Sequence, residues 1–370
     1  MKREKSVNKK NISTFQIVKD LFPIYRCLIG PGVLETLHYI KRLHPLLKIK
    51  KVRTGSKIYD WTIPEEWHVD EAWISDKKKN RIVDIKKNNL HLVGYSTPIN
   101  KVISYEELQK HLYSLEKQPN AIPYVTSYYK KTWGFCLQHS LRKKLKKENY
   151  RVFIKSKFKK GSLSYGELYL PGKSKKEIFF STYICHPSMA NNELSGPSVA
   201  IKIIDFLKKK KLKYSYRVIF IPETIGSIVY INKNIKNMKK NIIAGFNLSC
   251  LGDKGKFSII PSRNGNSISD KVIIRVLKDN NTKFNLYDWL DRGSDERQYC
   301  SPGVDLPVVS VSRSKYGNFP EYHTSLDNLD FVSAKYLNKS LLLFKRIINE
   351  IERSIFYKSK YLCEPKMSKR

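Results

Sequence analysis

The sequence lacks several features that would assign it to a familiar class. Its six cysteines form no CxxC pair, so a zinc knuckle built from thiolates is not expected, and a chain of 370 residues does not need disulfides to hold a core. No apolar run reaches the roughly 20 residues that span a bilayer. The basic N-terminal segment has no uninterrupted apolar stretch of the kind found in signal peptides. These absences predict a cytoplasmic protein with reduced thiols and no transmembrane segment.

Acidic residues are also scarce, with 33 Asp and Glu against 70 Lys and Arg and a formal net charge of +37. Such a charge arises either from lysines spread over solvated surfaces or from a surface that attracts nucleic acid, anionic membrane or acidic glycans. The basic runs at 77–79, 143–147 and 208–211 lie far apart, and no known nucleic-acid module surrounds them. We therefore expect no specific nucleic-acid partner.

The pattern of apolar residues divides the chain into parts. Residues 15–48 have helical periodicity with a Gly-Pro-Gly turn at 30–32, and 50–170 alternate like short antiparallel strands around one predicted helix at 104–118. From about residue 175, apolar strands at 177–186, 214–223, 242–252 and 306–313 alternate with helices at 195–211, 267–280 and 333–356. Strands of this kind predict a layered α/β domain whose sheet is covered on both faces.

These parts predict four regions. Residues 1–54 form N-terminal helices, 55–170 an inserted β-rich domain, 171–360 the α/β domain and 361–370 a basic tail. In an α/β sheet, functional residues gather at the carboxyl ends of the strands. His186, Glu223 and Asp253 each follow a predicted strand, whereas His323 lies in the loop before the last helix.

A lone histidine after a strand is more often structural than catalytic, but this combination of imidazoles and carboxylates suits Zn²⁺. In "HPSMANNELSG", Asn192 and Glu193 lie just before the start of a predicted helix and could turn back over the strand end. Glu223 could stabilise a helix N-terminus, or it could act as general base for a metal-activated water.

Several long stretches carry a family resemblance: "DWTIPEEW", "YYKKTWGFC", "STYICHPSMANNELSGP", "GSDERQYCSPG" and "PEYHTSLDNLDF". From about residue 25 to 365 the chain resembles bacterial polysaccharide-biosynthesis proteins with an aminopeptidase-like domain, relatives of the zinc-dependent exopeptidases. The resemblance implies a zinc-exopeptidase-like layered α/β domain with an inserted β-rich domain. It also implies a C-terminal winged-helix module, which is missing from this sequence after "CEPKMSKR".

The resemblance assigns roles residue by residue. His186 and His323 match the first and last metal-binding histidines of the aminopeptidases, and Glu223 matches their general base. The glutamate that follows the base in those enzymes is a metal ligand, and here it is Thr224. Since the carboxylates that would hold two metals are partly gone, one zinc ion is expected rather than two.

The bridging aspartate of the aminopeptidases falls on Asn192, and Glu193 beside it is the expected replacement ligand. The implied metal site is therefore His186, Glu193 and His323. Arg297 is expected to stabilise an oxyanion or hold a substrate carboxylate. The residues expected to bind substrate are Asn192, Asp295, Glu296 and Tyr322.

Three functions follow as hypotheses. The first is a zinc-dependent hydrolase that cleaves an amide bond in a peptide or an N-acylated amino sugar, linked to surface polysaccharide biosynthesis. The second is a catalytically inactive aminopeptidase-like protein that binds a peptide or glycan. The third is a basic scaffold that binds polyanions. The oligomeric state stays open.

Overall fold

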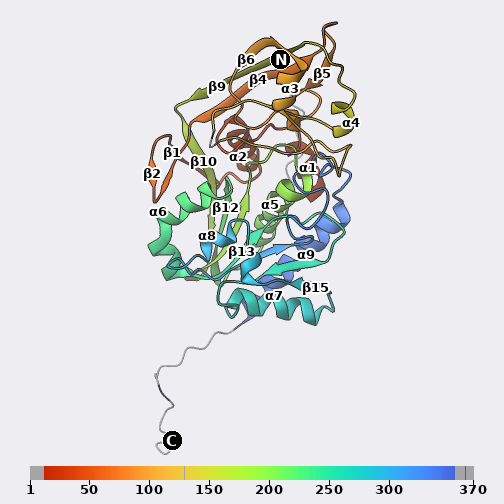
Figure 1. Cartoon of the computed structure of the whole chain (residues 1–370). Helices are drawn as coiled ribbons and strands as arrows, with labels where there is room; N and C mark the ends of the chain where they lie inside the picture. Colours follow the sequence, from red (N-terminus) through yellow and green to blue (C-terminus); the bar gives the residue numbers. More distant parts are fainter. Residues whose placement is uncertain (1–11, 129, 355–362, 364–370) are drawn as a thin grey trace, which may run out of the picture.

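The structure is a computed structural model that describes residues 12–128, 130–354 and 363. Its larger part is built on one eight-stranded sheet, seen in the lower half of Figure 1. In spatial order the strands are β1 (Lys48–Arg53), β10 (Ser162–Leu170), β12 (Tyr214–Ile221), β11 (Ser174–Tyr183), β13 (Ile242–Leu248), β16 (Val308–Ser312), β14 (Phe257–Ile260) and β15 (Phe284–Leu286). The four central strands, from β12 to β16, run parallel, and β10 and β14 pair antiparallel with the outer two of them. The predicted layered α/β domain is confirmed.

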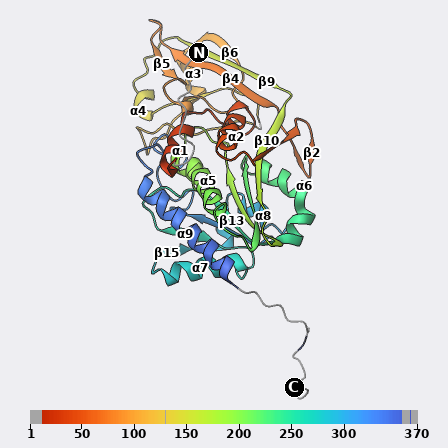
Figure 2. The same ribbon diagram turned by 180° about the vertical axis from the view of Figure 1, so that it is seen from behind.

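Helices cover both faces of this sheet. One face packs against α1 (Thr14–Leu21), α2 (Pro31–Leu43), α5 (Ser195–Leu207), α7 (Ile268–Asp279) and α9 (Ala334–Arg353), and most of these lie in front in Figure 2. The other face packs against α6 (Ile225–Asn241) and α8 (Glu296–Tyr299). Because the central strands are apolar on both sides, both layers are needed to remove them from water.

Helix α6 was not predicted from the sequence. Its buried residues are concentrated between Ile225 and Ile231, with Met238 near its end. The rest of the helix, rich in Asn and Lys, is largely exposed, so the apolar period over the whole segment is weak.

A second sheet forms the upper part of Figure 1. Its strands are β5 (Arg81–Asp84), β4 (Glu66–Ser75), β9 (Tyr150–Lys159) and β6 (Ile99–Ile103), and it has a separate hydrophobic core that includes Trp67 and Phe135. Two short pairs, β2 (Lys57–Ile58) with β3 (Trp61–Thr62) and β7 (Leu112–Tyr113) with β8 (Phe135–Cys136), complete the β structure. Strand β10 lies in the large sheet although it falls within the range predicted for the inserted domain. The division into domains stays a prediction.

The helix expected at 104–118 is shorter in the structure. It begins where the sequence indicated, because the Ser104 side chain accepts a hydrogen bond from the Glu107 amide at 3.2 Å. Helix α3 (Tyr105–Lys110) then ends, and the chain continues as β7, which pairs with β8. Pairing with a distant strand has overridden the local helical pattern. One further short helix, α4 (His139–Arg142), precedes β9.

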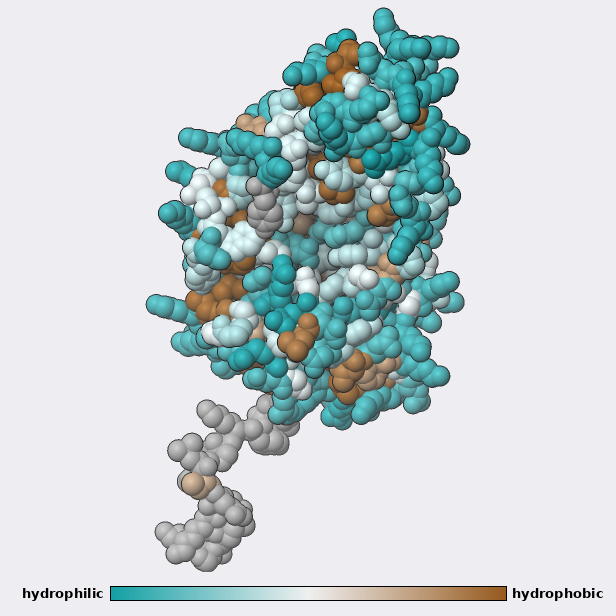
Figure 3. All heavy atoms as spheres, viewed as in Figure 1, coloured by the Kyte–Doolittle hydropathy of each residue, from teal (hydrophilic) through white to brown (hydrophobic). Residues whose placement is uncertain are grey.

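The surface is mostly hydrophilic on the face shown in Figure 3, with small separate hydrophobic patches. Within the described part of the chain, no helix combines the length and apolar character needed to cross a membrane. The predicted basic tail lies outside the described residues except for Cys363.

Candidate active site

Two neighbouring parallel strands bring His186 and Glu223 together. Strands β11 and β12 are adjacent and in register, and each of these residues lies just beyond the end of its strand. The Nε2 atom of His186 is 3.6 Å from Oε2 of Glu223. The fold therefore brings these two predicted site residues together, and their roles stay a prediction.

The segment Ala190–Leu194 forms one turn of π-helix, η2, and leads directly into α5. This turn directs Glu193 back towards the strand end. One carboxylate oxygen accepts hydrogen bonds from the His186 amide at 2.9 Å and from His186 Nδ1 at 2.7 Å. Glu193 thus orients the His186 imidazole through these hydrogen bonds. Carboxylates often orient metal-bound histidines in this way. Its assignment as a metal ligand stays a prediction.

Arg26 was missed in the sequence and proves central to the site. Its Nε lies 3.3 Å from the other carboxylate oxygen of Glu193, and both side chains are completely buried. The guanidinium also donates to the carbonyl oxygens of His186 at 3.0 Å and Leu21 at 2.7 Å. Burial lowers the pKa of Arg26, and the Glu193 carboxylate opposes that shift. The available signal was a single charged residue inside the apolar stretch "FPIYRCLI".

His323 approaches from the opposite side on the loop before α9. Its ring centroid is 5.3 Å from that of His186, and the Tyr124 ring lies beside both imidazoles, at 5.3 Å from His186 and 5.2 Å from His323. The Tyr322 ring stacks on His323 at 3.9 Å. Burial, together with the neighbouring His186, lowers the pKa of His323 to about 3, so this imidazole is neutral and can bind a metal ion.

Glu223 is held by the polypeptide that faces it. The Ser294 hydroxyl donates a 2.5 Å hydrogen bond to Oε1 of Glu223, and burial raises the pKa of this carboxyl. The next residue, Thr224, has φ of +63°, a strained conformation for a β-branched residue. Its amide donates to Asp295 at 2.7 Å, and its hydroxyl accepts a hydrogen bond from Arg297 at 3.1 Å.

The other predicted substrate-binding residues do not line the cavity at this site. Asp295 and Glu296 are completely buried, and Glu296 accepts hydrogen bonds from the backbone of 293–294 and from Tyr316. The Asn192 amide nitrogen donates to Tyr183 at 2.9 Å, and Tyr322 packs behind His323. Their assignment to substrate binding stays a prediction.

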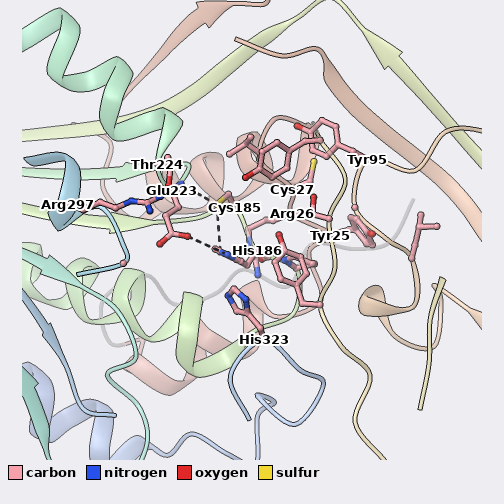
Figure 4. Close-up of a pocket in the computed structure, with 18 residues that line it drawn as sticks. Tyr25, Arg26, Cys27, Tyr95, Cys185, His186, Glu223, Thr224, Arg297 and His323 are labelled. Carbon is pink, nitrogen blue, oxygen red and sulfur yellow. Dashed lines mark hydrogen bonds and ion pairs between the residues drawn. The ribbon is translucent and has the colours of Figure 1, made fainter. Parts of the chain in front are cut away.

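The cavity has a volume of about 230 Å³ and is lined by the segments that follow β11 and β12, the loop between α1 and α2, and parts of the segments 92–95 and 124–128. Figure 4 shows His186, Glu223, Arg297 and His323 around it. Four tyrosines also line it: Tyr25, Tyr95, Tyr124 and Tyr128. The cavity therefore combines polar, titratable side chains with aromatic surface.

Two imidazoles at this cavity fit a metal ion. Nε2 of His323 is buried and has no hydrogen-bond partner among the described residues, and the same is true of Oδ1 of Asn192. Nε2 of His186 points away from Glu193, since Nδ1 is the atom that contacts that carboxylate. Cys185, His186 and Glu193 also place potential ligand atoms within 4.8 Å of one another.

Solved structures show the class to which this fold belongs. It is similar to BSAP, a zinc aminopeptidase from Bacillus subtilis, with a TM-score of 0.65 over 95% of this chain and 97% of that chain at 14% identity. It is more similar to a crystal structure of a Clostridium acetobutylicum protein, with a TM-score of 0.90 and 40% identity over 96% of this chain and 84% of that chain. The fold is thus that of the zinc aminopeptidases.

Within this class, the chain belongs to the family described as a domain of unknown function, DUF4910, whose model matches residues 15–354. A relative from Clostridium acetobutylicum is 40% identical over 357 residues, which cover 96% of this chain and 82% of the relative. Its name is "Putative polysaccharide biosynthesis protein with aminopeptidase-like domain". The family predicted from the sequence motifs is confirmed.

Proposed function

We propose that this protein is a zinc-dependent hydrolase that cleaves an amide bond in a peptide or an N-acylated amino sugar. The observation that carries the proposal is the convergence of His186, Glu223 and His323 on one cavity, with the Nε2 atom of His323 buried and unpartnered. His186 and His323 would hold the metal ion through their Nε2 atoms. When bound, zinc supplies Lewis-acid chemistry that activates water and polarises a carbonyl group.

Glu223, Ser294 and Arg297 have separate roles in the proposed reaction. Glu223 takes the proton from the attacking water, and its raised pKa brings it closer to the neutral range in which a general base is most effective. The Ser294 hydroxyl fixes the orientation of this carboxylate. Arg297 is exposed beside the cavity and can donate hydrogen bonds to a substrate carboxylate or to a developing oxyanion.

The buried Glu193 carboxylate positions His186 and does not take part in proton transfer from water. Glu193 accepts a hydrogen bond from Nδ1 of His186, which directs the Nε2 atom towards the cavity. Against the effect of burial, the neighbouring Cys185 and Glu193 raise the pKa of His186, so the proton on Nε2 would be lost when a metal ion binds. Arg26 compensates the negative charge of Glu193 away from water. This arrangement makes His186 a better and more rigid metal ligand.

Two features bear on the substrate. The tyrosines that line the cavity can pack against an amino-acid side chain or against a sugar ring. The name of the Clostridium relative connects that protein with polysaccharide biosynthesis, which supports an amino-sugar substrate as one option.

A second function has specific support. Asn192 and Thr224 carry no charge at the positions where the zinc aminopeptidases use carboxylate ligands. A protein with these changes could have kept the cavity and lost turnover, and would then bind a peptide or glycan without cleaving it.

One experiment separates the two functions. Protein purified without chelator is assayed for metal content and for turnover on aminoacyl anilides and N-acetylated amino sugars, together with Glu223→Gln and the exposed control Glu116→Gln. The hydrolase should hold about one zinc per chain, and Glu223→Gln should lose about 10²- to 10⁴-fold in turnover while keeping its metal. Ligand binding without turnover in all three proteins would support the binding function. Metal-free protein with no turnover and no binding would exclude both.

A further inference from the structure

A second pocket lies away from the candidate active site, at the end of the molecule where Figures 1 and 2 both place α7 and α9. It has a volume of about 460 Å³ and is formed by α7, α9, β14 and the loops that precede β14 and follow β16. Its lining includes six basic residues and no acidic residue: Lys254, Lys256, Lys283, Arg313, Lys339 and Arg346.

Arg313 distinguishes this pocket from an ordinary lysine-rich surface. Only 7% of the residue is exposed, and its Nε and Nη1 atoms are buried with no hydrogen-bond partner among the described residues. The guanidinium lies between two aromatic rings, 4.6 Å from the Phe257 centroid and 4.9 Å from the Tyr336 centroid. These rings hold the group in place, but they do not satisfy its N–H groups.

The nearby acidic side chains have other partners. Asp253 accepts hydrogen bonds from Asn191 at 2.8 Å and from Ser314 at 2.7 Å. At the far side of α7, Arg275 lies 3.5 Å from Asp279 and 3.1 Å from Glu350. Burial lowers the pKa of Arg313 and the Asp253 charge opposes that shift, but the guanidinium forms no ion pair with any described residue. The pocket therefore presents a concentrated positive field around a buried cation that is only partly compensated.

A buried guanidinium cannot avoid the cost of burying its charge by losing its proton, because its pKa is too high. An anion in the pocket would supply the missing charge and accept hydrogen bonds. Phosphoryl groups match the planar donors of arginine, and the surrounding lysines can neutralise additional negative charge. Val276, Leu342 and Leu343 add an apolar wall that sulfate or phosphate alone would leave uncovered.

We propose that this pocket binds a small molecule that carries two or more phosphoryl groups, with Arg313 as the central contact. The site is independent of the proposed hydrolase, because its lining shares no residue with the active-site cavity. It also gives part of the large positive charge a specific use, which a uniformly basic surface would not have.

The test uses inorganic pyrophosphate and ADP as probes, with binding to the full chain measured by calorimetry at about 0.15 M salt, where weak surface attraction is screened. Arg313→Met removes the charge and keeps an unbranched apolar side chain between the two rings. Lys144→Met is the matched control, since it removes one positive charge from an exposed position between α4 and β9. Lys339→Met tests the exposed rim, where the Lys339 ammonium lies 5.8 Å from the centroid of the Tyr336 ring, and it leaves Arg313 itself in place.

Saturable 1:1 binding is expected for the wild type and for Lys144→Met. Arg313→Met should weaken binding by about 10- to 100-fold, as for the loss of a charged hydrogen bond, and Lys339→Met by a smaller factor. If ADP binds more tightly than pyrophosphate, the nucleoside of ADP packs against the apolar wall. If the two bind equally, the pocket contacts only their phosphoryl groups. Equal affinity in the wild type and Arg313→Met, or binding only of long nucleic acids with no effect of either pocket variant, would overturn the proposal.

Discussion

Two buried arginines show opposite solutions to the same physical problem. Arg26 is completely buried and contacts Glu193 and two carbonyl oxygens, which leaves only its Nη2 without a hydrogen-bond partner among the described residues. Arg313 is almost as buried, but both its Nε and its Nη1 lack such a partner within the described part of the chain, and its guanidinium contacts aromatic faces. A buried charge is costly unless it is paired. Arg26 is therefore part of the folded candidate active site, whereas Arg313 is the residue that we propose binds an anion from solution.

Removing Arg26 should produce the largest effect. Arg26→Met leaves the Glu193 carboxylate buried without its cation, so we expect a loss of about 3–5 kcal/mol in the free energy of unfolding. Urea denaturation of the metal-free protein measures this change. The double variant Arg26→Met with Glu193→Gln should recover part of the loss, and a loss of less than about 1 kcal/mol in the single variant would show that the pair is not a structural unit.

Asp295 extends the comparison, because a buried carboxyl group, unlike a buried guanidinium, can become neutral. Burial, with the Glu223 charge beside it, raises the pKa of Asp295 from 3.8 to about 8. The folded protein then keeps a proton that the unfolded chain releases, so stability should fall as pH rises from about 4 to about 8.

Asp295→Asn should remove this part of the pH dependence, and Tm measured from pH 5 to pH 8 tests it. The exposed control Asp60→Asn should keep the wild-type slope. An unchanged slope in Asp295→Asn would mean that Asp295 is already ionised in the folded protein.

Arg313→Met should change stability much less than Arg26→Met. The variant loses the cation–π interaction with two rings but no longer buries a charge without an ion-pair partner, so these effects oppose each other. Without added anion, we expect a change of no more than about 1 kcal/mol in urea denaturation. A loss above about 2 kcal/mol would reveal a partner for Arg313 within the protein and would remove the contrast with Arg26.

Lys339→Met should give the smallest effect. Lys339 is exposed on α9, and substitutions at such positions usually change stability by less than about 0.5 kcal/mol. Pyrophosphate at saturating concentration should raise the Tm of the wild type more than that of this variant, because stabilisation follows binding affinity. Equal shifts in the two proteins would place the bound anion away from α9.

The sequence identified most of the fold because its strongest patterns are local. The apolar strands near His186 and Glu223 and the long amphipathic helix before residue 354 are all present in the structure. The predicted helix after Ser104 ends early in the structure because β7 pairs with β8. Helix α6 was not predicted because only part of it is buried, which weakens its apolar pattern. Such outcomes depend on contacts with residues far along the chain.

The sequence by itself determined the family, the strand-end positions of His186 and Glu223, and the excess of positive charge. Motif spacing and hydrophobic period are properties of neighbouring residues, so they can be recognised without coordinates. Only the tertiary structure decided that Glu193 contacts Nδ1 of His186, that Arg26 compensates its charge, and that Nε and Nη1 of Arg313 have no hydrogen-bond partner among the described residues. These facts concern charges brought together from distant segments and removed from water, and the energy of such charges depends on their surroundings in three dimensions.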